Sequence, residues 1–161
     1  MLPPLQRVEF WTPMLSLLQR VTTSTVTIDG VVVGEIGRGI VVFVGVEKGD
    51  GEREVDRMVE RILGYRMFSD GQGRMNRSVS DVEGGVLLVP QFTLPADTRS
   101  GMRPGLSPAA PPDVGRPLFE YLVDTARGRY GRVASGEFGA HMQVSLVNDG
   151  PVTFMLQVGQ S

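Results

Sequence analysis

Apolar residues in this chain gather mostly in short runs of the kind that form β-strands, with two stretches of helical spacing between them. Ile40–Val46 and Val86–Val89 are continuous apolar runs, which are typical of strands buried on both faces. Further segments combine β-forming residues with flanking turn residues, which predicts strands at Leu15–Val21, Ser24–Ile28, Val31–Ile36, Arg66–Ser69, Met142–Val147 and Val152–Val158. Strands therefore make up most of the predicted structure.

Helical spacing occurs in two places between these strands. In Glu52–Leu63 the apolar residues lie three and four positions apart, and Asp50 is placed to cap the start of a helix. A second helix is predicted at Val114–Arg127, with Asp113 before it as the cap. Strands interrupted by two helices indicate an α+β fold, in which the helices cover a mainly antiparallel, barrel-like sheet.

Glycine, proline and polar residues mark the connections between the elements. Asp29-Gly30 is a hairpin signal, and residues 95–112 form a predicted loop with five prolines. Long loops of this kind in compact domains often carry function. Residues 1–13 differ in composition from the rest and are interpreted as a disordered arm or as a start assigned too early, with Met14 as the true start. Residues 14–161 are predicted to form a single domain.

Composition narrows the classes of protein. A chain of 161 residues with 41% hydrophobic content fits one soluble domain, and no apolar run is long enough to cross a membrane. The sequence has no Cys, which excludes disulfides, thiolate catalysis and Cys-based zinc sites. A net charge of −2 argues against a general nucleic-acid binder but permits a local basic surface. The arginines that can receive phosphates there, or that can simply be solvated, are Arg99, Arg116, Arg127, Arg129 and Arg132.

Two short segments carry the candidate chemistry, Pro90–Leu94 and Asn148–Thr153. Neither contains Cys, His, Lys or a pair of carboxylates. Each joins a strand to a turn, so chemistry there would use backbone amides and a rigid turn in place of acid and base side chains. His141 is the only histidine in the sequence, and it can be a structural residue or the base of an ordinary small-molecule hydrolase.

These two segments belong to a longer series of motifs that occurs in the same order in a known family. The series comprises Leu18–Val21, Gly45–Lys48, Leu63–Arg66, Met75-Asn76, Gln91–Leu94, Gly101–Pro104 and Met142–Thr153. From Met14 to Val158 the chain thereby resembles the D-aminoacyl-tRNA deacylases, which hydrolyse the ester between a D-amino acid and tRNA. Gln-Phe-Thr-Leu and Asn-Asp-Gly-Pro-Val-Thr are the most specific of these motifs.

The resemblance implies the deacylase fold and a cytoplasmic proofreading enzyme that acts on the aminoacylated 3′ end of tRNA. It implies a homodimer with its sites at the subunit interface, no cofactor, no metal and no membrane. In the family, backbone N–H groups of the first motif stabilise the negative charge on the ester carbonyl oxygen. This gives Phe92 and Thr93 the catalytic role, with Gln91 anchoring the loop or the substrate. No side-chain nucleophile takes part, and the 2′-hydroxyl of the terminal adenosine assists.

The resemblance assigns substrate binding and chiral selection to the second motif. The peptide bond between Gly150 and Pro151 is expected to be cis and to enter the partner's pocket, where it excludes an L side chain. Asn148 belongs to the same motif, Arg20 is implied to brace the loop, and Met102 is implied to lie near the terminal adenosine. A pocket that selects by chirality cannot reject glycine, so glycine mischarged on tRNA(Ala) is a second implied substrate.

Pro90 departs from the family pattern, which usually has Ser before the glutamine. Proline removes a hydroxyl and a backbone N–H and fixes φ. A related branch that acts on mischarged L-alanine carries Pro here, whereas Asn148-Asp149 follow the D-specific pattern. Three interpretations stay open: a D-specific deacylase, a related deacylase with relaxed chirality, and a non-catalytic aminoacyl-tRNA binding module. We expect the strand to end at Pro90, which would leave the amides of Phe92 and Thr93 free.

Overall fold

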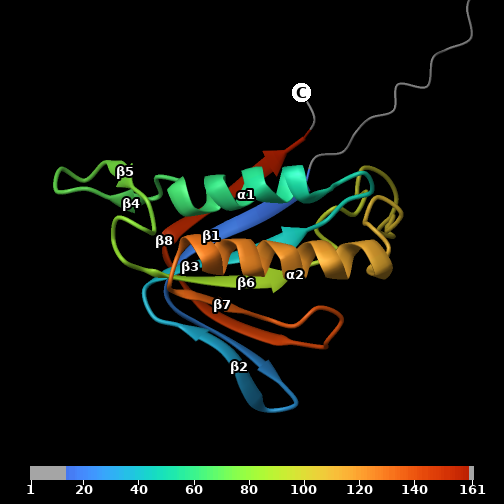
Figure 1. Cartoon of the computed structure of the whole chain (residues 1–161), viewed down its shortest axis with the longest axis horizontal. Coiled ribbons are helices and arrows are strands. Elements are labelled where there is room, and N and C mark those ends of the chain that lie inside the picture. The colour runs from blue at the N-terminus through green and yellow to red at the C-terminus, as the bar shows by residue number, and fades with distance from the viewer. Residues whose placement is uncertain (1–13, 160–161) are drawn as a thin grey trace, which may run out of the picture.

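The computed structural model describes residues 14–159, and the predictions for residues 1–13 fall outside that range. Figure 1 shows two helices lying over one face of a curved sheet. The helices are α1 (Glu52–Gly64) and α2 (Pro112–Arg129). The strands are β1 (Met14–Ile28), β2 (Val31–Ile36), β3 (Gly39–Gly45), β4 (Phe68–Ser69), β5 (Met75–Arg77), β6 (Gly85–Pro90), β7 (Val133–Ser135) and β8 (Gln143–Val158).

The main sheet has the strand order β2-β1-β3-β6-β7, and β8 pairs with β1. The pairs that β1 makes with β2, β3 and β8 are antiparallel, whereas β3–β6 and β6–β7 are parallel. The predicted α+β class and the two covering helices are confirmed, and the sheet is mixed where the prediction was mainly antiparallel. The parallel pairs arise because α1 and α2 each connect two neighbouring strands of the sheet (Figure 1).

Two predicted strand breaks are absent from the described chain. Leu15–Val21 and Ser24–Ile28 belong to the single strand β1, and the two C-terminal predictions merge into the single strand β8. The β1–β8 ladder absorbs the polar residues through register shifts on either side of Val21. Such bulges bend a strand without ending it, so turn-forming residues alone gave the wrong boundaries.

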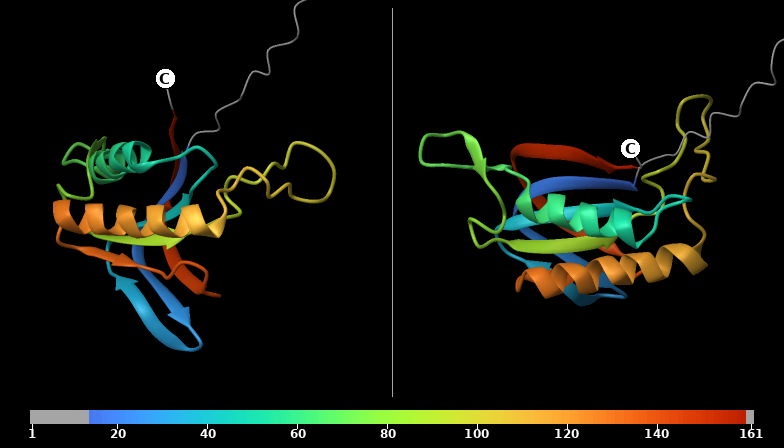
Figure 2. Two further views of the ribbon diagram at one scale, coloured as in Figure 1. Left: turned by 45° about the vertical axis from the view of Figure 1, so that its right-hand side comes forward. Right: turned by 45° about the horizontal axis from the view of Figure 1, so that its top comes forward.

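The core has two layers, one on each face of the sheet. Along β3, Ile40, Val42 and Val44 pack beneath the helices, and Val41 packs on the opposite face. This placement explains why the sequence of β3 is apolar without alternation. Figure 2 shows α1 and α2 on one side of the sheet, while β2 and the adjoining parts of β1 and β8 curl toward the other side. The second layer therefore lies inside the curl of the sheet.

Neither aspartate predicted to cap a helix does so. The N-cap of α1 is Gly51, whose N–H donates to the Glu54 carboxylate at 2.9 Å. Asp50 instead accepts a hydrogen bond from the N–H of Glu47 at 2.8 Å. The N-cap of α2 is Pro111, and Asp113 lies in the first turn, where a negative charge favours the helix dipole. α1 nevertheless begins at Glu52 as predicted, whereas α2 begins at Pro112, two residues before the predicted start.

The two ends of the sheet carry different appendages (Figure 1). One end carries the hairpin of β4 and β5, and the other carries the loop of residues 91–111. The loop is fastened to the chain after β3, because Lys48 N–H donates to Pro108 O at 3.0 Å and Ala110 N–H donates to Val46 O at 2.9 Å. In the described part of the chain, no helix is long and apolar enough to span a bilayer.

Asp50 makes the stability of this fold depend on pH. Burial is the main cause that raises the pKa of Asp50 to about 7 from its ordinary value of 3.8, and the neighbouring Glu47 and Glu54 raise it further, against the hydrogen bond from the Glu47 amide. A raised pKa means that the folded chain holds a proton that the unfolded chain releases. The resulting stability is complete below the unfolded pKa and is lost as the pH rises through about 7.

We therefore expect the free energy of unfolding of the wild-type protein to fall between about pH 4 and about pH 7 in urea titrations. Asp50→Asn keeps an oxygen that accepts from the Glu47 amide but has no charge to bury. This variant should lose that part of the pH dependence and should be the more stable protein at the upper pH. An identical pH dependence in the two proteins would contradict the assignment.

Candidate functional site

The first candidate segment follows directly from the end of β6. Gln91 N–H donates to Val44 O at 2.8 Å and extends the ladder by one bond, and Leu94 N–H then donates to Gln91 O at 3.2 Å to close a turn. Between these bonds, the amides of Phe92 and Thr93 donate to no acceptor among residues 14–159. The Phe92 side chain is 61% exposed, and the Gln91 amide nitrogen donates to the Thr93 hydroxyl. The turn thus presents two free donors at the surface.

Pro90 is the last residue of β6, as predicted. Alternate amides of this strand face alternate neighbours, since Val86 N–H donates to Arg132 O and Gln91 N–H donates to Val44 O. The nitrogen of Pro90 therefore faces the β7 side, where the paired residues end at Leu88. A residue without an N–H costs no ladder bond at this position, which explains why proline fits the end of a central strand.

The second candidate segment is a corner within β8. The Gly150-Pro151 bond is cis, which confirms that prediction. Asn148 Oδ1 accepts from Val152 N–H at 2.8 Å, and Asn148 Nδ2 donates to the Thr153 hydroxyl at 2.9 Å. Gly150 has φ +143°, and a Cβ there would lie 2.6 Å from the Val152 side chain. The corner therefore requires glycine and is held from both sides by one asparagine.

Arg20 connects this corner to a neighbouring element. Its Nε donates to Asp149 O at 2.9 Å, and its Nη1 donates to Met67 O at 3.0 Å, just before β4. The Asp149 carboxylate lies 3.8 Å from Nε, and the Arg20 side chain is only 15% exposed. The expectation that Arg20 braces the Gly-Pro loop agrees with these contacts. The bond to Met67 was not predicted, because a backbone acceptor leaves no signal in the sequence.

The role of the Thr153 hydroxyl is a second feature that the sequence did not predict. Its hydroxyl accepts from Asn148 Nδ2 and, at 3.3 Å, from Gln19 Nε2 on β1. The β1–β8 register places Gln19 directly opposite Thr153. Each of the two motifs contains one threonine, which was the available signal that its hydroxyl organises the turn. Both candidate segments thus use one amide side chain and one threonine hydroxyl to fix a turn.

Met102 and His141 lie outside these hydrogen-bonded turns. Met102 is 99% exposed at the far side of the 91–111 loop, so it is available to a ligand and packs against nothing described. His141 is exposed and makes no hydrogen bond with another described residue, so no carboxylate or hydroxyl in residues 14–159 arranges it as a base. No group of three metal-ligating side chains occurs in the same residues.

The arginines considered as one phosphate-binding group are dispersed. Arg99 is paired with Asp97 at 2.9 Å within the loop. Arg116 and Arg127 line a pocket of about 220 Å³ beside α2 that also contains three carboxylates, and Arg132 lines a different pocket. The five arginines therefore do not form one phosphate-binding surface, because Arg99 is paired within the loop and Arg116 and Arg127 lie in another pocket than Arg132.

The two candidate segments lie at opposite ends of the sheet. β8 pairs with β1 so that Asn148 lies opposite Val21, and the ladder continues across β3 to Gly85 at the start of β6. Gln91 follows the last residue of β6. The six residues of β6 therefore lie between the level of Asn148 and the level of Gln91, which is about 20 Å at 3.3 Å per residue. Figure 1 shows the same arrangement, with β6 running away from the hairpin end where β8 turns. One chain alone therefore does not bring the segments together.

Known proteins that resemble this chain belong to one family. The family model described as D-Tyr-tRNA(Tyr) deacylase matches residues 17–157. A protein of Nitrosococcus oceani named D-aminoacyl-tRNA deacylase is 58% identical over 145 residues, which cover 90% of this chain and 94% of that protein. A protein of Pseudomonas putida with the same name is 57% identical over 145 residues, which cover 90% of this chain and 100% of that protein.

Solved structures share the fold. The structure named c-Myc DNA Unwinding Element Binding Protein has a TM-score of 0.86 and 36% sequence identity, and the match covers 91% of this chain and 99% of that one. A probable eukaryotic D-amino acid tRNA deacylase has a TM-score of 0.79 at 18% identity, with coverage of 90% and 99%, and shows the fold alone.

The contacts of Arg20 predict how the corner responds to its loss. Arg20→Ala removes two hydrogen bonds from a charged donor, each worth about 1.5–3 kcal/mol. Amide hydrogen exchange at Val152 should accelerate by at least about tenfold, while the core of β3 stays protected. Arg61→Ala is the matched control, because Arg61 also donates to a β8 carbonyl, Gln157 O, but far from the corner. Equal exchange at Val152 in both variants would show that Arg20 does not hold the corner.

Proposed function

Because this chain belongs to the D-Tyr-tRNA(Tyr) deacylase family and is a hydrolase of D-aminoacyl-tRNA esters, we propose that two copies of it build each active site together. One copy supplies Gln91, Phe92 and Thr93, and the other supplies the corner at Gly150 and Pro151. Each homodimer then has two equivalent sites, as a two-fold interface requires. The substrate is the aminoacylated 3′ end of tRNA in the cytoplasm.

The observation that carries this proposal is the separation of the two segments. Both are ordered by their own hydrogen bonds and both are exposed, yet the sheet holds them about 20 Å apart. A single chain presents a set of donors at one end and a shaped corner at the other. A two-fold pair whose sheets run in opposite directions brings the donors of each copy to the corner of the other.

The free amides of Phe92 and Thr93 fit the chemistry of ester hydrolysis. Attack of water on the ester carbon places negative charge on the carbonyl oxygen. Two N–H groups aimed at that oxygen stabilise the charge, and one such donor contributes about 2.7–4 kcal/mol in known hydrolases. The 2′-hydroxyl of the terminal adenosine lies next to the ester and assists the reaction. No base on this chain is required, which agrees with the unpartnered position of His141.

The corner supplies selection by exclusion. Asn148 and Arg20 fix the backbone of Gly150 and Pro151, so the corner does not yield to a side chain pressed against it. An L side chain would point into this rigid backbone, whereas a D side chain points away from it. Glycine has no side chain to exclude, so glycine mischarged on tRNA(Ala) is a second substrate. Met102, on the exposed 91–111 loop, contacts the terminal adenosine.

Pro90 does not disable the site in this proposal. It removes no bond from the ladder and leaves the amides of Phe92 and Thr93 free. Its effect is confined to the missing hydroxyl beside the turn. This favours a D-specific deacylase over the non-catalytic binding module, and it leaves relaxed chirality as the alternative to be measured.

The direct test is hydrolysis of D-Tyr-tRNA, L-Tyr-tRNA and Gly-tRNA(Ala) by the wild-type protein and by Pro90→Ser. We expect D-Tyr-tRNA and Gly-tRNA(Ala) to be hydrolysed and L-Tyr-tRNA to be spared. Pro90→Ser should change the D-Tyr rate by no more than about tenfold, or 1.4 kcal/mol. The opposite result would be that the wild-type protein hydrolyses D-Tyr-tRNA no faster than buffer alone, while Pro90→Ser hydrolyses it several orders of magnitude faster. That result would identify a disabled binding module.

The proposed donors predict a specific pattern among substitutions at Thr93. Thr93→Pro deletes the amide and should lower the rate at least about a hundredfold. Thr93→Ala keeps the amide and loses only the hydroxyl that accepts from Gln91, so its rate should fall far less. His141→Ala should stay within a few-fold of wild type. A loss above about a hundredfold in His141→Ala, the scale of general-base catalysis, would overturn the backbone mechanism.

A further inference from the structure

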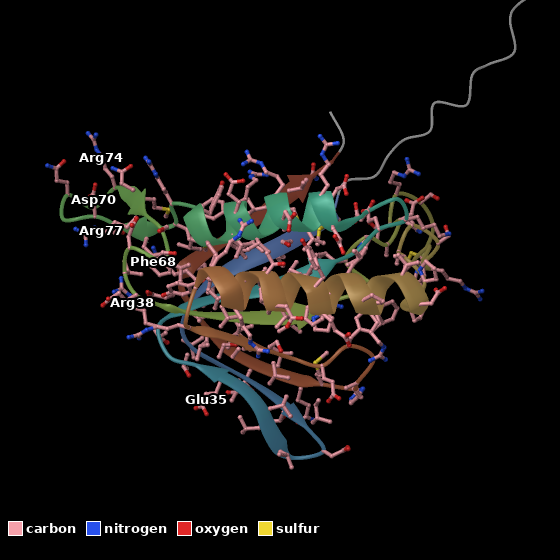
Figure 3. The ribbon with its side chains drawn as sticks, in the orientation of Figure 1. Glu35, Arg38, Phe68, Asp70, Arg74 and Arg77 are labelled. Carbon is pink, nitrogen blue, oxygen red and sulfur yellow. The ribbon has the colours of Figure 1, made fainter. Side chains whose placement is uncertain are left out.

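The end of the sheet that carries the corner also carries a ridge of arginines, Arg38, Arg74 and Arg77. All three are exposed, and within residues 14–159 none has a carboxylate oxygen within 4.0 Å. Figure 3 shows them along one edge of the molecule, with Arg74 and Arg77 on the hairpin and Arg38 below them. On a chain with a net charge of −2, unpaired cations gathered at one edge are a local feature and do not reflect the composition.

The hairpin that carries Arg74 and Arg77 is held rigidly. The Asp70 carboxylate accepts from the N–H groups of Gln72 and Arg74, at 2.8 and 3.0 Å, and from Asn76 Nδ2 at 2.9 Å. These hydrogen bonds lower the pKa of Asp70, and the bond from Asn76 has the largest effect. The Asp70 carboxylate is therefore charged and holds the turn together. The arginine side chains are therefore carried on a fixed base, and Arg77 lies close enough to Asp70 and Asp81 to help lower the pKa of both carboxyl groups.

Arg38 is fixed in place by an aromatic ring. Its guanidinium carbon lies 5.5 Å from the centroid of the buried Phe68 ring, within the range of a cation–π contact. Phe68 pairs with Arg77 across the β4–β5 hairpin. This pairing brings Arg38 and Arg77 to the same place although 39 positions separate them in the sequence. The ridge is thus continuous from the hairpin to the end of β2.

Acidic residues limit the ridge on one side. Arg38 itself lines a pocket of about 430 Å³ that also contains Arg132, Glu35 and Glu83. Figure 3 places Glu35 on β2, away from the hairpin. The mixed charge of this pocket makes it a poor site for an anion, so Arg38 can serve an anion only on the side that faces the hairpin.

The ridge is tied to the corner by Arg20. Its Nε donates to Asp149 O in the corner, and its Nη1 donates to Met67 O directly before β4. One side chain therefore joins the corner to the chain that leads into the hairpin. In the proposed dimer, on which this step rests, the copy that inserts its corner into the partner's site also carries its ridge to the rim of that site.

We propose that Arg38, Arg74 and Arg77 contact phosphates of the tRNA acceptor stem while the aminoacyl end occupies the site of the partner copy. Guanidinium groups suit phosphate oxygens because their donors form a planar fork. The contacts are to the backbone and are independent of the amino acid. They give the enzyme affinity for tRNA that the small aminoacyl pocket alone does not supply.

The test compares a whole substrate with a minimal one. Arg74→Gln/Arg77→Gln should raise the KM for D-Tyr-tRNA about tenfold and leave the hydrolysis of D-tyrosyl-adenosine, which has no stem, unchanged. The logarithmic salt dependence of tRNA binding, measured by fluorescence anisotropy, should become shallower by about 0.9 for each lost phosphate contact. Arg53→Gln/Arg57→Gln on α1 is the matched control, since it removes the same charge from another exposed face.

Each outcome decides the proposal. Equal tRNA binding and equal salt dependence in the ridge and control variants would overturn it. A loss of activity on D-tyrosyl-adenosine as large as that on D-Tyr-tRNA would also overturn it, because the ridge would then act on the site and not on the stem. If the wild-type protein hydrolyses neither ester, the proposed function fails, and the anisotropy titration still decides whether the ridge binds tRNA.

Discussion

The antiparallel ladder between β1 and β8 is the constraint on which the rest of the structure depends. It runs from Met14 opposite Val158 to Thr27 opposite Gln143, and it contains the corner at Gly150 and Pro151 within its length. Because β1 also pairs with β3, this ladder fixes how far the corner lies from the end of β6. The hydrogen bonds of Arg20 and Asn148 refine the shape of the corner, but the ladder determines its place.

The same constraint explains how a site can work without acid and base side chains. Backbone donors and backbone obstacles are useful only when they cannot move, because their contribution depends on being aimed before the substrate arrives. Here the amide side chains of Gln91 and Asn148 each form a hydrogen bond that fixes a turn. In the proposed site, these polar side chains hold the geometry and the backbone contacts the substrate.

The sequence was most informative where one physical effect dominated. The apolar runs of β3 and β6 predicted buried strands because no other element is apolar without alternation. The boundaries of β1 and β8 were wrong because bulges, which leave no clear mark in the sequence, carried the strands through polar residues. The motif residues marked the two exposed, hydrogen-bonded turns from which the proposed site is built. Their separation by the sheet, and the Arg20 bond to Met67 O, depend on tertiary register and could not be derived from local pattern.

The central claim, that each site is shared between two copies, can be tested by mixing two inactive variants. Thr93→Pro damages the donor turn, and Gly150→Ala places a Cβ 2.6 Å from the Val152 side chain and damages the corner. Each variant alone should be nearly inactive on D-Tyr-tRNA. After unfolding and refolding together, half of the dimers are mixed and each has one intact site, so activity should recover to about a quarter of wild type. If native mass spectrometry shows that mixed dimers have formed and no activity returns, the account is contradicted.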